Sequence, residues 1–204
     1  MSQTDLSREL YQSLWNAADI LRGQMEANEY KSYLLGLIFY KYLSDNILQA
    51  VCDNLDETYE SFQQAQLLYE ENFADADVRE DLIEVLNDEL GYVIEPSLTF
   101  TKLVQSIHEG TFQLESLAQS FRDIEQANEK FENLFEDIDL YAKKLGNTPQ
   151  KQNKTISEVM KQLNDLNVSG HAGDILGDAY EYLIGQFASD SGKKAGEFYT
   201  PQAV

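Results

Sequence analysis

Cysteine, histidine and proline are scarce in this chain of 204 residues. The single cysteine, Cys52, excludes an internal disulfide framework, and beside Val51 it is expected to be a small buried residue in a reducing compartment. His108 and His171 have no second histidine or cysteine at ligand spacing, so no metal site is expected. No stretch approaches the roughly 18 consecutive apolar residues of a membrane helix, and no signal-peptide pattern opens the chain. We therefore expect a cytoplasmic protein that makes no membrane contact.

Positive charge is scarce as well. Against 36 Asp and Glu stand 15 Lys and Arg, which gives a formal net charge of -21. Residues 53–95 alone hold 14 acidic side chains and one basic one, Arg79, and are expected to form solvated helix faces. The electrostatic field of so many acidic side chains repels phosphate backbones. The chain also lacks the basic surface that is typical of a nucleic-acid-binding domain. The 43% of hydrophobic residues still indicates a folded, globular protein.

Apolar residues at helical spacing run through most of the chain and predict a mainly α fold, a helical bundle. The helix predicted after Asn28 is apolar over most of its circumference, so we expect it at the centre of the core. Residues 92–94 precede Pro96 and are expected to be extended, because the residue before a proline disfavours the helical region. The helical rows cover residues 4–22, 30–43, 78–90, 103–107, 114–124 and 131–145.

A polar stretch follows these rows. Residues 146–154 are predicted to form a surface loop, and Thr155 with Glu158 is predicted to cap the next helix.

A glycine-bearing break at residues 169–173 marks the expected domain boundary. We expect an N-terminal helical domain over residues 1–168 and a second unit over residues 169–204. Within the second unit, Asp174 caps a predicted helix that ends near Phe187.

The last loop of the chain carries a glycine and two lysines at residues 192–194. A phosphate-binding P-loop is excluded, because the preceding glycine, Gly185, stands at the wrong spacing and no Ser or Thr follows the lysine. Thr200 and Pro201 form an N-cap and first-turn pair, so a helix start with free backbone N–H groups is expected there. Phe198 and its neighbour Tyr199 would offer stacking surface to a ligand; a structural role for these rings is the alternative.

Two long segments of the chain resemble one known family. "LWNAADILRGQMEANEYKSYLLGLIFYKYLSD" (residues 14–45) looks like the opening of the modification subunit of type I restriction-modification systems. "DILGDAYEYLIGQFASDSGKKAGEFYTPQAV" (residues 174–204) looks like the entry into its methyltransferase domain. Between them, "LGYVIEP" and "LFEDIDL" also fit, so the resemblance spans nearly the whole chain.

The resemblance implies an S-adenosylmethionine-dependent adenine-N6 DNA methyltransferase, with an all-helical N-terminal domain ahead of a Rossmann-like catalytic domain. In that family the Phe-Tyr-Thr-Pro segment lines the S-adenosylmethionine pocket. Carried over to this chain, the cofactor-contacting residues are Glu197, Phe198, Tyr199, Thr200, Pro201 and Gln202.

Other family motifs are absent from the 204 residues. Neither the Asp-Pro-x-x-Gly-x-Gly cofactor loop nor an Asn-Pro-Pro-Tyr or Asn-Pro-Pro-Phe motif for a flipped adenine occurs, so no catalytic residue can be named. We expect a fragment that is truncated where the catalytic domain begins and that is inactive on its own.

The implied partners are a specificity subunit, a second modification subunit and a restriction subunit, with DNA bound in the assembled complex. An acidic helical domain is better suited to subunit assembly and closure around DNA than to broad contact with the DNA phosphates. A different hypothesis, based on the acidic run at residues 53–95, is a stand-alone acidic protein that binds basic partners or mimics DNA.

Overall fold

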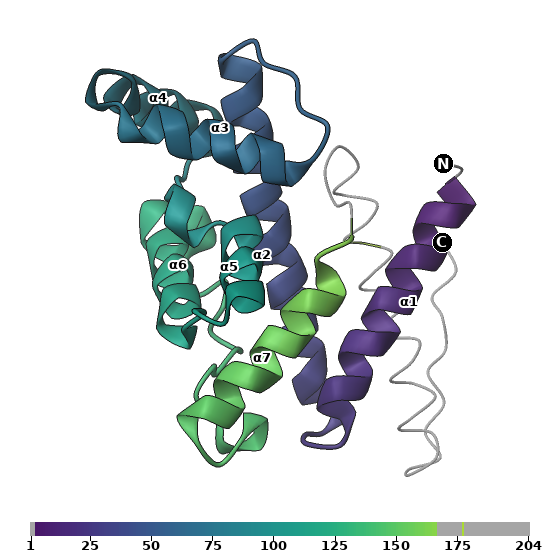
Figure 1. Ribbon diagram of the computed structural model, residues 1–204. Helices are drawn as coiled ribbons and strands as arrows, with labels where there is room; N and C mark the ends of the chain where they lie inside the picture. Colours follow the sequence, from purple (N-terminus) through teal and green to yellow (C-terminus); the bar gives the residue numbers. More distant parts are fainter. Residues whose placement is uncertain (1–2, 167–176, 178–204) are drawn as a thin grey trace, which may run out of the picture.

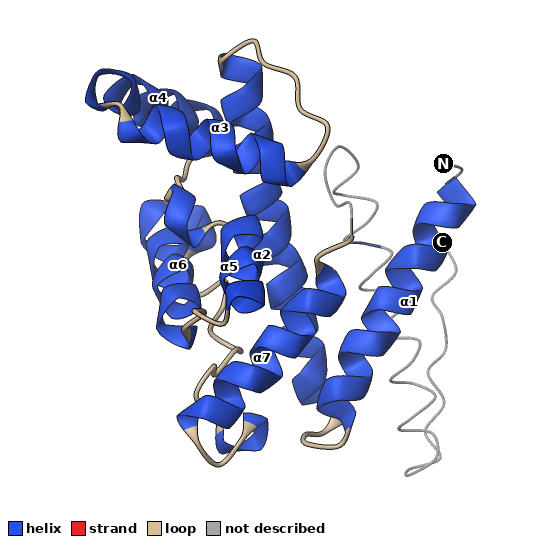
Figure 2. Ribbon diagram, viewed as in Figure 1, coloured by secondary structure: helices blue, strands red, loops and turns tan. Residues whose placement is uncertain are grey.

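The computed structural model describes residues 3–166 and residue 177, and in this part of the chain the regular elements are all helices (Figure 2). The prediction of a mainly α fold is therefore confirmed. The α-helices are α1 (Gln3–Arg22), α2 (Ala27–Asn54), α3 (Phe62–Ala74), α4 (Ala76–Leu90), α5 (Phe100–Glu109), α6 (Leu114–Ala127) and α7 (Pro149–Leu163). Short 3-10 helices lie at η1 (Pro96–Leu98), η2 (Glu129–Phe131) and η3 (Lys143–Leu145).

Helix α2 is the axis of the fold. It runs through the middle of the molecule, with α3 and α4 across one end, α5 along its side and α1 against its other half (Figure 1). The expectation that this helix forms the centre of the core is confirmed. It begins at Ala27, so Asn28 lies in its first turn, and the Glu29 carboxylate accepts a hydrogen bond from the Glu26 backbone N–H at 3.0 Å. Fully buried residues occur along its length: Leu34, Leu37, Ile38, Tyr40, Ile47, Leu48, Val51 and Cys52.

Helix α7 begins earlier than its sequence predicts. Thr148 is the N-cap, its hydroxyl accepts from the Lys151 backbone N–H at 3.3 Å, and Pro149 occupies the first turn. The predicted cap residue, Thr155, is instead buried within the helix and donates its hydroxyl to the Leu145 carbonyl at 2.8 Å. The Thr-Pro pair determines the start because proline is preorganised for the first helical turn, and the expected polar loop is helical from Pro149 onward.

Residues 131–145 correct a second prediction, since they form successive turns with two short 3-10 helices at their ends rather than a longer helix. Backbone N–H groups donate to carbonyls three residues earlier, as in Leu134 to Phe131 and Ile138 to Phe135. Asn133 has a φ of 60°, which interrupts any helix at that point. Each of these turns spans four residues, about one helical turn, so apolar residues three positions apart occur here without a continuous helix.

Helices α3 and α4 form a hairpin across one end of α2 (Figure 1). Gly91, with a φ of 80°, ends α4 in the left-handed conformation that glycine adopts without strain. Two buried side chains of α3 fix the hairpin to the segment that follows it: Gln66 donates to the Pro96 carbonyl at 2.8 Å and Tyr69 to the Ile94 carbonyl at 2.9 Å. Residues 92–94, expected to be extended, belong to neither a helix nor a strand.

Candidate functional site

The predicted cofactor-contacting residues, 197–202, lie outside the described residues, as do His171 and the predicted helix after Asp174. The described part does contain a second copy of the tripeptide Thr-Pro-Gln, at residues 148–150 as well as 200–202. At the first position Thr148 caps α7 and Pro149 lies in its first turn. The tripeptide can therefore start a helix in this chain.

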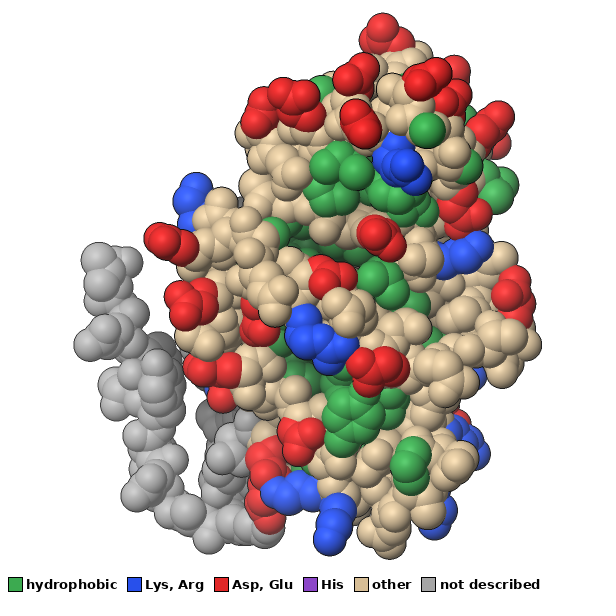
Figure 3. Space-filling model, turned by 90° about the vertical axis from the view of Figure 1, so that its left-hand side faces the viewer, with side chains coloured by type: hydrophobic (Ala, Val, Ile, Leu, Met, Phe, Trp, Pro, Cys, Tyr) green, Lys and Arg blue, Asp and Glu red, His purple; other side chains and the backbone are tan. Residues whose placement is uncertain are grey.

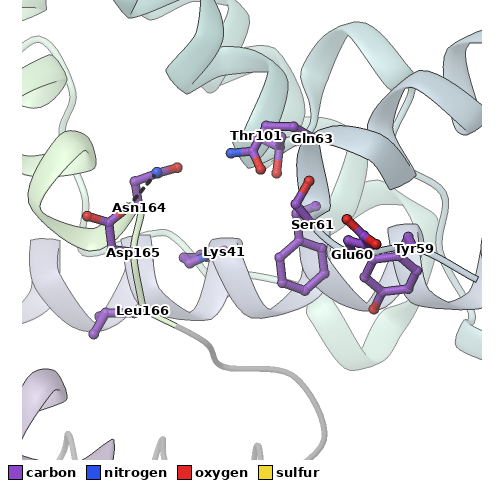
Figure 4. Close-up of a pocket in the computed structure, with 10 residues that line it drawn as sticks. Lys41, Tyr59, Glu60, Ser61, Gln63, Thr101, Asn164, Asp165 and Leu166 are labelled. Carbon is purple, nitrogen blue, oxygen red and sulfur yellow. Dashed lines mark hydrogen bonds between the residues drawn. The ribbon is translucent and has the colours of Figure 1, made fainter.

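A pocket of about 320 Å³ opens between α2, α5, the start of α3 and the residues that follow α7. Lys41 lies in the middle of the lining (Figure 4). Asn164 and Asp165 lie to one side of it, and Ser61 and Tyr59 lie to the other. The lining mixes amides, hydroxyls and carboxylates with aromatic rings. Among the described residues, the lining includes the Ser61 hydroxyl and the Glu60 carboxylate but no histidine or cysteine.

A buried ion pair lies at this pocket. Lys41 Nζ donates to Asp45 Oδ2 at 2.8 Å, and the two side chains are 3% and 0% exposed. The ammonium also lies 5.1 Å from the centre of the Phe100 ring and 5.4 Å from that of Phe62, within the range of cation–π attraction. The second carboxylate oxygen, Asp45 Oδ1, is buried without a hydrogen-bond partner in the described structure.

Burial raises the pKa of Asp45 to about 6, and the nearby Lys41 ammonium only partly opposes this shift. The pair was missed in the sequence, although a lysine and an aspartate four residues apart in an otherwise apolar helix were a usable signal. Their burial depends on Phe62 and Phe100, which come from two other helices. A lysine already neutralised by a carboxylate has no free charge for a ligand, and we assign the pair to the structure of the core.

Acidic side chains gather at the end of the molecule where the α3–α4 hairpin lies (Figure 3). Six carboxylates of α4 are exposed, and five of them lie at helical spacing on one surface, which we call the acidic ridge. Its members are Asp77, Glu80, Asp81, Glu84 and Asp88.

Metal binding has no support in the described part of the chain, where no group of three or more His, Cys, Asp or Glu side chains is placed to hold an ion. No helix among the described residues is both long and apolar enough to cross a membrane. Cys52 is buried as expected, and burial raises the pKa of its thiol.

The described residues thus form an acidic domain whose regular elements are helices. The family model "HsdM N-terminal domain" matches residues 10–163, and the model "N-6 DNA Methylase" matches residues 171–204. The chain therefore belongs to the HsdM N-terminal domain family, and the resemblance found in its sequence is confirmed.

Individual relatives agree with this assignment. The chain is 29% identical over 216 residues to the type I restriction enzyme MpnII methylase subunit of Mycoplasma pneumoniae, covering 99% of this chain and 39% of that protein. It is 27% identical over 209 residues to the MjaIX methylase subunit of Methanocaldococcus jannaschii, covering 98% of this chain and 34% of that one. The crystal structure of a type I restriction-modification methyltransferase subunit from Streptococcus thermophilus superimposes with a TM-score of 0.86 at 63% identity, over 96% of this chain and 42% of that chain. The chain thus spans about two fifths of these relatives.

Proposed function

We propose that this chain is the N-terminal part of a type I modification subunit that methylates adenine N6 in DNA with S-adenosylmethionine. The observation that carries the proposal is the order of the two family matches, a helical domain over residues 10–163 and a methylase segment over residues 171–204. The helical part serves the assembly of the subunit with a specificity subunit, a second modification subunit and a restriction subunit, and helps to enclose DNA. We place the division between its two units at residues 168 and 169.

The charge of the helical part supports assembly rather than DNA binding. The whole chain has a net charge of -21, and 31 of its 36 Asp and Glu lie in residues 1–168. This charge opposes the approach of phosphates and is compatible with contact to other proteins. In this proposal other parts of the complex bind the DNA phosphates.

Residues 197–202 are the proposed cofactor-contacting stretch: Glu197, Phe198, Tyr199, Thr200, Pro201 and Gln202. A helix that starts at Thr200 would direct backbone N–H groups toward the carboxylate of S-adenosylmethionine. The α7 start at Thr148 supports this, because the same tripeptide caps a helix there. Since a single wall of a pocket cannot bury a ligand, residues 1–204 alone are expected to bind the cofactor weakly.

Methyl-transfer assays test the proposal. Residues 1–204 alone should transfer no labelled methyl group to DNA, because the motifs that hold the adenine are absent from them. Added in excess to a reconstituted complex, they should lower its methylation rate by occupying partner surfaces of the full subunit. Methylation by residues 1–204 alone contradicts the assignment of the chemistry. An undiminished rate in the mixture contradicts the assembly role and favours the stand-alone acidic binding protein.

A further inference from the structure

The acidic ridge of α4 is costly to the helix that carries it. Its carboxylates face each other at spacings of three and four residues, where like charges destabilise a helix. The adjacent pairs are Asp77–Glu80, Asp77–Asp81, Glu80–Glu84, Asp81–Glu84 and Glu84–Asp88.

Asp77 lies in the first turn of α4, where the helix dipole favours an acidic side chain, but no ion pair compensates the ridge in the described part of the chain. None of its ion pairs involves a ridge carboxylate, and the one basic residue of α4, Arg79, lies 5.9 Å from the centre of the Phe73 ring. By contrast, α3 has Glu70 paired with Lys102 at 2.8 Å, and α7 has Lys154 four residues before Glu158. The ridge therefore concentrates unneutralised negative charge on one helix surface.

Buried contacts anchor the hairpin to the domain and leave the surface of the ridge exposed. The inner side of α3 is fixed by the buried hydrogen bonds of Gln66 and Tyr69, and α4 buries Leu82 and Leu86 on the side opposite to its exposed carboxylates. The hairpin extends across one end of the molecule, where its outer surface is uncovered by other described elements (Figures 1 and 3). A fixed helix surface loses little conformational entropy when it binds a partner.

We propose that the acidic ridge is a docking surface for a protein surface rich in lysine and arginine, carried by another subunit of the modification complex. Charge complementarity decides the class of partner: DNA is repelled, and the same ridge on a second copy of this chain is repelled as well. The identity of the partner as a subunit rests on the proposed assembly role, whereas the docking surface itself rests on the uncompensated charge of α4.

The test exploits opposite effects on stability and on binding. In the full-length subunit, the ridge variant Glu80→Gln, Glu84→Gln, Asp88→Asn removes repulsion, so its melting temperature should rise. Its dissociation constant for the purified specificity subunit should increase about tenfold, and the affinity should depend less on salt than that of the wild type.

A matched control removes three exposed carboxylates from the turn segment outside the hairpin: Glu132→Gln, Glu136→Gln, Asp137→Asn. The control should leave the dissociation constant within about twofold of the wild-type value. Equal affinity of wild type, ridge variant and control would overturn the docking surface and leave the assembly role intact. A wild-type subunit that does not bind the specificity subunit at all would overturn the assembly role, and with it the identity of the partner. Equal weakening by both variants would show a nonspecific effect of net charge and would also overturn the proposal.

Discussion

Three tyrosines combine a buried ring with a hydrogen bond from the phenol hydroxyl to a backbone carbonyl. Tyr40, Tyr69 and Tyr92 donate their hydroxyls to the carbonyls of Leu98, Ile94 and Leu43. Burial raises the pKa of all three phenols, so they remain protonated donors. Removal of the Tyr69 hydroxyl would take this hydrogen bond from the Ile94 carbonyl, which lies outside the helices, and an unpaired buried carbonyl is unfavourable.

The Lys41–Asp45 pair yields a prediction about stability. Lys41→Met alone should lower the free energy of unfolding by about 3 kcal/mol or more, because it leaves an unpaired carboxylate in the core. Adding Asp45→Leu should recover this loss and exceed the wild-type stability at neutral pH by about 1 kcal/mol or more, since a buried ion pair is often weaker than apolar packing. Urea denaturation of the single and double variants measures both effects. A double variant as unstable as the single one would refute this account.

The same pair predicts a pH dependence. The pKa of Asp45 is raised from 3.8 to about 6 in the folded protein, so its contribution to stability is present at acidic pH and is lost as the pH rises through 6. The stability advantage of the Lys41→Met, Asp45→Leu variant over the wild type should therefore be larger at about pH 8 than at about pH 5. An advantage that shrinks as the pH rises would show that the pKa of Asp45 is lowered by Lys41 instead.

At the scale of elements, Gly36 allows the turn segment to lie against α2. A Cβ at this position would collide with Ile138 Cδ1 and approach Phe135 at 3.8 Å. Gly36→Ala should therefore lower the free energy of unfolding by about 1–3 kcal/mol despite the better helix propensity of alanine.

Ile138→Val removes the colliding methyl group and provides the control. In combination with Gly36→Ala it should recover most of the loss, although Ile138→Val alone costs about 1 kcal/mol. Thermal denaturation of the two single variants and the double variant gives the coupling between the sites. Additive losses would mean that the two residues do not interact.

The elements show what the sequence could and could not predict. Helices α1, α2, α4, α5 and α6 follow from apolar periodicity and, for α4, from Gly91. Residues 131–145 could not be assigned this way, because apolar residues three and four positions apart occur there without a continuous helix, and Asn133 in the left-handed region gives only a weak signal in sequence. The start of α7 was predictable, since Thr148-Pro149 is a stronger signal than the pair at Thr155 and Glu158.

The candidate sites also differ in how far the sequence alone could predict them. The acidic ridge is visible in the sequence, because its charges follow a single helix. The Lys41–Asp45 pair is visible only as a spacing, since its burial is created by α3 and α5, far along the chain. Residues 197–202 remain a prediction from the family resemblance.

At the scale of the molecule, the net charge of -21 makes self-repulsion a general cost of folding. Raising sodium chloride from about 20 to about 300 mM should therefore increase the melting temperature, because screening shortens the range of repulsion. The increase should be smaller for the ridge variant than for the Glu132, Glu136, Asp137 control variant, since the ridge holds the closest like charges. Differential scanning fluorimetry measures both, and a melting temperature that falls with salt would show that attractive ion pairs dominate.

The packing of α1 against α7 bears on the synthesis of the chain. These two helices lie side by side and make the most extensive contact between elements (Figure 1), yet in the sequence they are the first and the last helices of residues 3–166. While the chain emerges from the ribosome, α1 is synthesised long before α7, which ends at Leu163. The contact between α1, which carries the buried Leu14 and Leu21, and α7 can therefore form only late in translation. The nascent domain therefore exposes an apolar helix face during most of its translation, which makes it a natural client for chaperones that bind close to the ribosomal exit.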